Sequence, residues 1–334
     1  MTGTKRACVI GGSGFLGSSL IKTLLEKGYG VNATLRDPEN TKKSSHLTAL
    51  HELGELKLFA ADLTDRDSFQ APISGCEFVF LVATPIVVAS EDPENDMIKP
   101  AIEGVKNVIN ACGKEKTVKR VILTSSAGVV AVNDLSGTGI LINESNWSDA
   151  AFLARDKPPA WGYLVSKILG EQAAWIAARE NNVDLVTVIP SIIAGEASTT
   201  DVPNGVQLSM ALITGNQFYL KLMKDMQRVS GSIAIVHVED LCRAQVFLAE
   251  KESASGRYIC SAYNASVPDL GKLLKTRYPR YDIPTETDLE ELPSKAKVIL
   301  SSEKLIGDGF CFKHQIEDIY DELVKYFQQK GLIT

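Results

Sequence analysis

The chain has 334 residues, of which 45% are hydrophobic and 23% are charged. This length suggests about two domains, or one domain with a large insertion, and the composition excludes disordered, collagen-like and low-complexity chains. The net charge of −6 at pH 7 argues against nucleic acid or an anionic membrane as the main partner.

The cysteines are scattered along the chain, and none forms a Cys-x-x-Cys pair. With only four histidines, the sequence predicts reduced thiols and no metal site. The N-terminus lacks the apolar stretch of a secretory signal, and the most apolar run, residues 78–89, is too short to span a bilayer. We therefore expect a cytoplasmic protein without membrane insertion, and the oligomeric state stays open.

The first half of the chain alternates short apolar runs, typical of buried strands, with segments of helical spacing. In chain order we expect a strand, a helix, three strands, a helix, a strand, a helix and a strand, at Ala7–Ile10, Ser18–Lys27, Gly30–Leu35, Leu56–Ala60, Phe78–Ala83, Pro100–Cys112, Arg120–Thr124, Trp161–Glu180 and Leu185–Ile189. This alternation predicts an α/β fold with a Rossmann-type, doubly wound parallel sheet.

The pattern loosens after residue 190. Residues 195–232 are expected to be loop and helix, followed by a strand over Ser232–His237 and a helix over Glu239–Lys251. Proline-punctuated short helices are expected in residues 264–334. We therefore predict a nucleotide-binding domain of residues 1–190, to which residues 232–251 return. A smaller, mostly helical substrate-binding region comprises residues 191–231 and 252–334.

A glycine-rich segment joins the first strand to the first helix. Glycines at 11, 14 and 17 let the backbone turn tightly, approach a pyrophosphate and pack the helix on the strand. The N-terminus of the helix offers free N–H groups and a partial positive charge. We predict that Gly11, Gly14, Phe15, Leu16 and Gly17 bind a dinucleotide. The Gly-x-x-Gly-x-x-Gly spacing is typical of short-chain dehydrogenase/reductases.

The end of the second strand bears on the choice of dinucleotide. A guanidinium at Arg36, with Lys43 following, can stack on adenine and pair with a 2′-phosphate, so NADPH/NADP is preferred over NADH. Asp37 is the counter-argument, because an acidic residue in this region binds the ribose 2′-OH of NAD. Asp62 and Leu63 follow the third strand and fit a contact to the edge of adenine, although Asp62 could simply cap a helix.

A second group of residues predicts the chemistry. Tyr163 and Lys167 share one helical face at i and i+4, and Ser126 ends the fifth strand, where an α/β sheet forms its cofactor crevice. The serine hydroxyl can bind a substrate oxygen and the tyrosine can donate a proton. The lysine can lower the pKa of the tyrosine and hold the nicotinamide ribose. We predict Ser126, Tyr163 and Lys167 as catalytic residues.

Three other features compete for these roles. Ser125 is the rival serine, but Ser126 directly precedes an alanine, as the catalytic serine does in the superfamily pattern. A second Tyr-x-x-x-Lys at 326–330 has no serine-bearing strand before it and is interpreted as part of an amphipathic helix. His237 follows a strand and is interpreted as structural or pocket-lining.

Taken together, the motifs resemble the extended short-chain dehydrogenase/reductases of plant flavonoid and phenylpropanoid metabolism. The shared segments are residues 11–17, 35–38, 82–85, 92–95, 123–127 and the Tyr163–Lys167 pair. The resemblance covers nearly the whole chain. It implies that Val82, Ala83, Thr84 and Pro190 also contact the cofactor.

Residues 90–102, 157–163, 212–216 and 249–260 are most similar to the branch of this family that reduces anthocyanidins. The resemblance implies NADPH-dependent reduction of a flavonoid such as cyanidin to a 2,3-cis-flavan-3-ol such as epicatechin. Gly17 stands where this branch often has alanine.

Two alternatives stay open. A dihydroflavonol or flavanone 4-reductase is disfavoured because Ala131 stands where that branch has asparagine, with Asn133 two residues late. A non-catalytic NADP(H)-binding regulator is disfavoured by the intact serine, tyrosine and lysine. Around the tyrosine and lysine, residues 160–167 also differ from the signature of cinnamoyl-CoA reductases.

Overall fold

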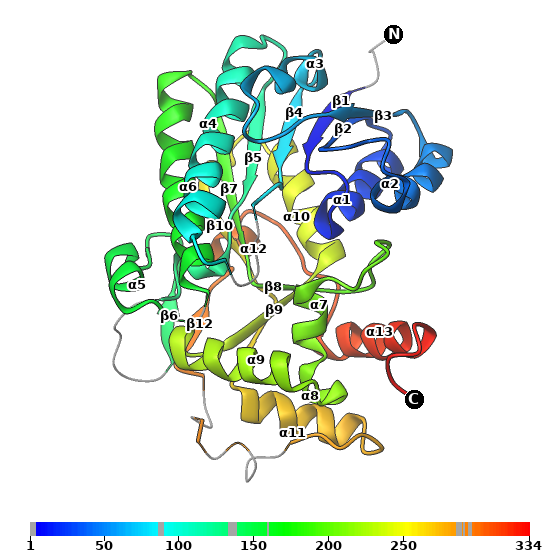
Figure 1. Ribbon diagram of the computed structural model, residues 1–334, viewed down its shortest axis with the longest axis vertical. Helices are drawn as coiled ribbons and strands as arrows, with labels where there is room; N and C mark the ends of the chain where they lie inside the picture. The colour runs from blue at the N-terminus through cyan, green and yellow to red at the C-terminus, as the bar shows by residue number, and fades with distance from the viewer. Residues whose placement is uncertain are drawn as a thin grey trace.

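The computed structural model describes residues 5–85, 90–132, 139–158, 160–284, 289, 291–292 and 296–334, so Asn133 lies outside the described residues. Seven parallel strands form one sheet in the order β10-β7-β5-β4-β1-β2-β3 (Figure 1). In chain order they are β1 (Arg6–Ile10), β2 (Gly30–Leu35), β3 (Leu56–Ala60), β4 (Phe78–Leu81), β5 (Arg120–Thr124), β7 (Leu185–Pro190) and β10 (Gly256–Cys260). This arrangement confirms the predicted α/β fold with a Rossmann-type parallel sheet.

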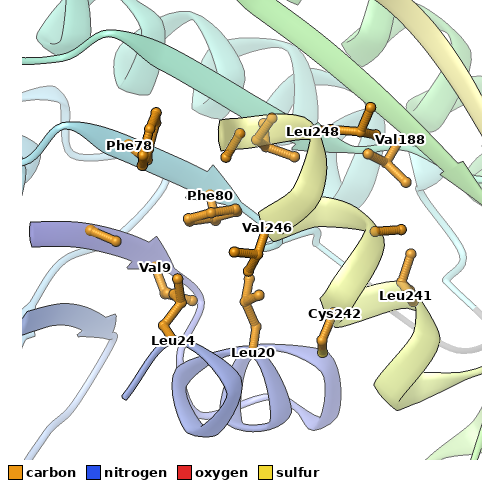
Figure 2. Close-up of a cluster of buried hydrophobic side chains, with 14 of the residues drawn as sticks. Val9, Leu20, Leu24, Phe78, Phe80, Val188, Leu241, Cys242, Val246 and Leu248 are labelled. Atoms are coloured by element: carbon orange, nitrogen blue, oxygen red, sulfur yellow. The ribbon is translucent and has the colours of Figure 1, made fainter. Parts of the chain in front are cut away.

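Helices cover both faces of this sheet. Side chains alternate along β1, so that Ala7 and Val9 belong to one hydrophobic cluster and Cys8 and Ile10 to another. The first cluster packs against α1 (Phe15–Glu26) and α10 (Val238–Glu250), and Figure 2 shows its side chains from α1, α10 and strands of the sheet meeting there. The second packs against α4 (Lys99–Lys114) and α6 (Trp161–Glu180). Both faces are buried, which explains why these strands read as continuous apolar runs.

The predicted elements of the first half agree with the structure. The bounds of β2, β3, β5 and α6 match the prediction, and the other elements differ by a few residues at their ends. Connecting elements are α2 (Thr41–Thr48), α3 (Gln70–Ile73) and α5 (Ala150–Asp156), the 3₁₀ helices Ala49–Leu53, Arg66–Phe69 and Ala127–Val129, and a π-helical turn, Glu94–Ile98.

The C-terminal region is mixed, whereas the sequence predicts it to be mostly helical. A three-stranded sheet consists of β8 (Ile192–Ala194), β9 (Ile233–His237) and β11 (Tyr263–Ala265), and β12 (Val298–Leu300) pairs with β6 (Ile140–Ile142) of the N-terminal half. The predicted strand over Ser232–His237 is confirmed as β9, whereas strands of three residues are too short for their alternation to be recognised. Around them lie α7 (Asn204–Ser209), α8 (Ala211–Thr214), α9 (Gln217–Ser230), α11 (Val267–Arg277), α12 (Glu303–Gly307) and α13 (Ile316–Gln329). Most of these helices build a separate hydrophobic cluster in the lower part of Figure 1.

Two segments differ from the expected division of the chain. Strand β9 pairs with β8 and β11 and not with the large sheet, so that within residues 232–251 it is α10 that packs on the nucleotide-binding fold. Conversely, β10 lies in the segment predicted to bind substrate, yet it pairs with β7 as the edge strand of the large sheet. An edge strand far along the chain cannot be assigned from its own short sequence.

Candidate active site

The loop between β1 and α1 is held by β2. The N–H of Gly11 donates to Thr34 Oγ1 (3.2 Å) and the N–H of Gly12 to the Thr34 carbonyl oxygen (2.8 Å). Gly14 is the exposed N-cap of α1, and among the described residues no side chain caps this helix and no acidic residue occupies its first turn. The positive end of α1 is therefore open to an anion.

Gly11, Gly14 and Gly17 differ in what the fold requires at each position. Gly11 has φ of +97°, and a Cβ at Gly17 would lie 2.1 Å from the Gly11 carbonyl oxygen. Gly11 must be glycine because of this left-handed conformation and because a Cβ there would lie 2.9 Å from Ala83, whereas Gly17 must be glycine because the helix approaches the loop closely. A Cβ at Gly14 would meet only that same oxygen, at an ordinary 3.6 Å. The fold alone does not need glycine at 14, and a ligand could approach the backbone closely at this position.

The segment that follows β2 carries the residues predicted to discriminate between dinucleotides. Arg36 and Lys43 are exposed, and in the described part of the chain neither has a carboxylate within ion-pair distance. Asp37 accepts a hydrogen bond from the N–H of Glu39 at 3.1 Å, so one oxygen is committed to its own turn. Hydrogen bonds from Thr64, joined by the charge of Arg36, hold the pKa of Asp62 below its usual value. Asp62 therefore closes a turn with Thr64, whereas the N-cap of the 3₁₀ helix Arg66–Phe69 is Asp65.

The segment after β4 lies beside the glycine-rich loop that joins β1 to α1. The N–H groups of Val82 and Ala83 both donate to the Ile10 carbonyl oxygen, at 3.1 and 2.9 Å. A small cavity connects the predicted cofactor-binding residues with the predicted catalytic residues. Its lining includes Leu63, Ala83 and Thr84 of the first group and Lys167 of the second. Phe15 and Leu16 are half-buried at the start of α1. Pro190 ends β7 and is buried against β10.

Ser126, Tyr163 and Lys167 come together at the carboxyl end of β5. Ser126 follows that strand and caps the turn Ala127–Val129, accepting from the N–H of Gly128 at 3.3 Å. Lys167 Nζ donates to Thr84 Oγ1 (2.9 Å) and to the Thr124 carbonyl oxygen (3.0 Å). Helix α6 presents Tyr163 one turn before the lysine, and Tyr163 is hydrogen-bonded with Ser126.

The ionisation of this group differs from the expectation. Burial raises the pKa of Tyr163, and the hydrogen bond with Ser126 opposes it only in part. Burial also lowers the pKa of Lys167 to about 8, opposed by the charge of Glu171. The prediction that Lys167 lowers the pKa of Tyr163 is therefore wrong for the protein without ligand. Lys167 donates its hydrogen bonds to Thr84 and Thr124 and not to Tyr163. Desolvation of the phenol is therefore the largest effect on the pKa of Tyr163.

The competing residues have other partners. Ser125 donates to the buried carboxylate of Glu171 at 2.6 Å, which leaves Ser126 as the serine beside Tyr163. Tyr326 lies on α13, packed in the C-terminal hydrophobic cluster. His237 is buried, with Nε2 3.1 Å from Glu322, as expected for a structural histidine.

The prediction of no metal site stays a prediction. His237, Glu239 and His314 bring possible ligand atoms within 4.8 Å of one another. Sequence spacing could not reveal this group, because it joins residues from distant segments. The sequence reasoning also missed Glu171 and Arg257, which form a buried ion pair at 2.7 Å; the position of Glu171 four residues after Lys167 was the available signal.

The fold and this site define a nicotinamide-dinucleotide-dependent oxidoreductase of the extended short-chain dehydrogenase/reductase type. The chain belongs to the NAD dependent epimerase/dehydratase family, whose model matches residues 7–265.

Similar proteins narrow the class further. The chain is 61% identical to an anthocyanidin reductase ((2S)-flavan-3-ol-forming) of Vitis vinifera, over 99% of this chain and 97% of the relative. It is 43% identical to a dihydroflavonol 4-reductase of Gerbera hybrida, over 98% and 87%. Among solved structures, vestitone reductase from alfalfa matches with a TM-score of 0.84 and 36% identity, over 98% of this chain and 99% of that one. No described helix is both long and apolar enough to cross a membrane.

Proposed function

We propose that the chain is an anthocyanidin reductase that uses NADPH to reduce anthocyanidins such as cyanidin to 2,3-cis-flavan-3-ols such as epicatechin. The observation that carries this proposal is the near full-length identity to the grapevine anthocyanidin reductase, well above that to the dihydroflavonol 4-reductase. The grapevine enzyme's name specifies a (2S) product, so the configuration at C2 is part of the test below.

NADPH is preferred over NADH for a reason of local charge. Arg36 and Lys43 are exposed cations near the end of β2, where the adenosine ribose of a dinucleotide lies in this fold. Asp37, the residue that would favour NAD, already accepts a hydrogen bond from the Glu39 N–H. A guanidinium suits a 2′-phosphate, because charge-assisted hydrogen bonds to phosphate are strong. When bound, NADPH supplies hydride from C4 of its nicotinamide.

The residues at the end of β5 have distinct roles in this proposal. Conversion of a flavylium cation to a flavan-3-ol takes up two hydrides and one proton, so two NADPH are oxidised per molecule reduced. Tyr163, whose raised pKa keeps its phenol protonated at neutral pH, donates the proton. Ser126 holds the tyrosine and a substrate oxygen, and Lys167 places positive charge beside them.

The proposal also includes the place where the flavonoid binds and the cellular compartment of the reaction. The flavonoid is proposed to bind in the C-terminal region, opposite a cofactor held by residues 1–190. All six cysteines are free and five are buried, which suits a reducing compartment, and we propose the cytoplasm.

The test is NADPH oxidation by the purified protein with cyanidin and, separately, with dihydroquercetin, with chiral chromatography of the products. Flavan-3-ol from cyanidin, with two NADPH oxidised per product, is the expected result. Reduction of dihydroquercetin alone would overturn the proposal and favour a 4-reductase. NADPH binding without turnover of either flavonoid would favour the non-catalytic regulator.

Matched variants tie the activity to the proposed site. Tyr163→Phe is expected to slow turnover, whereas Tyr326→Phe is expected to leave it unchanged. The two tyrosines share the same Tyr-x-x-x-Lys spacing, but Tyr326 is buried in the C-terminal cluster on α13. Equal effects of the two substitutions would contradict the assignment of Tyr163.

A further inference from the structure

A buried carboxylate lies directly behind the proposed site. Glu171 is one helical turn after Lys167 on α6 and only 2% exposed. Its Oε2 accepts from Ser125 Oγ at 2.6 Å, and its Oε1 accepts from Arg257 Nε at 2.7 Å. Each carboxylate oxygen therefore has its own donor, one from the end of β5 and one from β10.

The guanidinium that partners Glu171 is itself fixed. Arg257 Nη1 donates to the carbonyl oxygens of Glu144 and Asn146, at 2.7 and 2.8 Å, and the guanidinium carbon lies 3.8 Å from the centre of the Trp147 ring. Burying an ion pair stabilises a fold little or not at all compared with apolar packing. An ion pair held this firmly next to a reactive lysine therefore suggests a purpose in the site.

Two routes connect Glu171 to the reacting groups. The first is mechanical: Ser125 stands between Thr124, whose carbonyl oxygen accepts from Lys167 Nζ, and Ser126, so its bond to Glu171 fixes the backbone that carries both. The second is electrostatic, because the negative charge of Glu171 raises the pKa of Lys167 against the effect of burial.

We propose that Glu171 is a positioning residue of the reductase site, anchored by Arg257, which fixes the strand end that carries Ser126 and places a carboxylate one helical turn from Lys167. The proposal rests on the proposed function only for the role of Lys167 in turnover. The charged or titratable groups around the lysine are Tyr163 and Glu171 on α6 and, behind Glu171, Arg257 on β10. The β4 and β5 ends contribute the uncharged Thr84, Thr124 and Ser125.

The direct test measures the protonation of Lys167 without cofactor or substrate. The full chain is labelled with acetic anhydride over a pH series, and the extent of labelling at Lys167 is followed by mass spectrometry of its peptide. The wild-type midpoint is expected at about 8. In Glu171→Gln it should fall by about half a pH unit or more, because an attractive charge is lost. Glu171→Asp, which keeps the charge, should stay near the wild-type midpoint.

Glu180→Gln is the matched control. Glu180 lies on the same helix but is exposed, so loss of its charge should not move the midpoint. An unchanged midpoint in folded Glu171→Gln would overturn the proposal, as would an equal shift in Glu180→Gln. If Glu171→Gln does not fold, the double variant Glu171→Gln/Arg257→Met replaces it, since no unpaired guanidinium is then buried; a smaller fall is expected, because the repelling charge of Arg257 is removed as well.

Turnover of cyanidin provides the second measurement. The alkaline limb of kcat/KM for NADPH, which reports ionisations of the free enzyme, should move to lower pH in Glu171→Gln by the same amount as the labelling midpoint, whereas Ser125→Ala should lower kcat/KM without moving that limb. A limb that stays in place while the midpoint falls would overturn the role in turnover. The labelling result stands independently if cyanidin proves not to be the substrate, so failure of the two proposals can be told apart.

Discussion

Alanine at position 14 or 17 separates what the fold requires of the glycine-rich loop from what the cofactor requires. A carbon atom normally stays about 3.3 Å or more from a carbonyl oxygen, whereas a Cβ at Gly17 would lie 2.1 Å from the Gly11 oxygen. The loop or α1 must therefore move by about 1.2 Å, the difference between these distances. Helix α1 is anchored by buried leucines, including Leu20 and Leu24 (Figure 2), so the movement is resisted.

For Gly17→Ala we expect a loss of about 1–3 kcal/mol in the free energy of unfolding, as for other overpacked positions. NADPH should also bind more weakly, because the N–H groups at the start of α1 move with the helix. For Gly14→Ala, φ of −77° suits alanine and the nearest atom is 3.6 Å away, so stability should change by no more than about 0.5 kcal/mol. Its Cβ fills the space proposed for the pyrophosphate, and NADPH affinity should fall about tenfold or more.

The assays are thermal unfolding and titration of NADPH fluorescence, each on both variants. Gly17→Ala should lower the melting temperature by several degrees, and Gly14→Ala should not. The reasoning is refuted if Gly14→Ala binds NADPH like the wild type, or if Gly17→Ala unfolds at the wild-type temperature. The second outcome would agree with the alanine that the branch resembled by this sequence often carries at this position. It would mean that the loop relaxes at little cost.

Four further predictions concern the cofactor, the reaction, the fold and its pH dependence. Arg36→Ala should weaken NADPH binding by about 1.5–3 kcal/mol more than NADH binding, because NADH loses only the stacking on adenine; equal losses in fluorescence titrations would contradict the 2′-phosphate assignment. Tyr163→Phe should lower kcat with cyanidin by less than the usual ~10²–10⁴-fold, because a cation accepts hydride readily; a larger loss with intact NADPH affinity would oppose this. Arg120→Met should cost about 3 kcal/mol of stability in denaturant unfolding, since the buried Arg120 bonds Asp184 and three carbonyl oxygens; a cost near zero would show that these bonds are dispensable. Finally, kcat/KM for NADPH should fall as pH rises through about 8, where Lys167 of the free enzyme loses its proton; a constant kcat/KM up to pH 10 would exclude a role for its charge.

Six of the seven strands of the large sheet could be predicted because each of these six is recognisable by itself, whereas β10 is not. Strands such as Gly30–Leu35 and Arg120–Thr124 are buried throughout, and the helices between them end at clear signals. The C-terminal sheets could not be predicted. Ile192–Ala194 and Tyr263–Ala265 are three residues long and pair with β9, from a distant part of the chain. Their strand conformation comes from that pairing, which local sequence does not encode.

The site was predictable for a related reason. Residues at the ends of parallel strands meet at one edge of the sheet whatever the lengths of the intervening helices, so Ser126 could be placed near the glycine loop from its strand alone. Glu171 and Arg257 could not be paired in this way. Their contact requires β10 to lie beside β7, and the sequence gives no sign that residues 256–260 return to the large sheet.

The protonation of Tyr163 shows where spacing stops being informative. The i, i+4 spacing suggests that Lys167 acts on the tyrosine through charge, yet its hydrogen bonds are made to Thr84 and Thr124, and burial raises the pKa of the phenol. A raised pKa suits reduction, because the group must be protonated before it can donate. A lowered pKa would suit the reverse reaction, in which the phenolate accepts a proton. The direction of the shift follows from desolvation, which depends on the packing around α6 and not on the distance between two residues in the sequence.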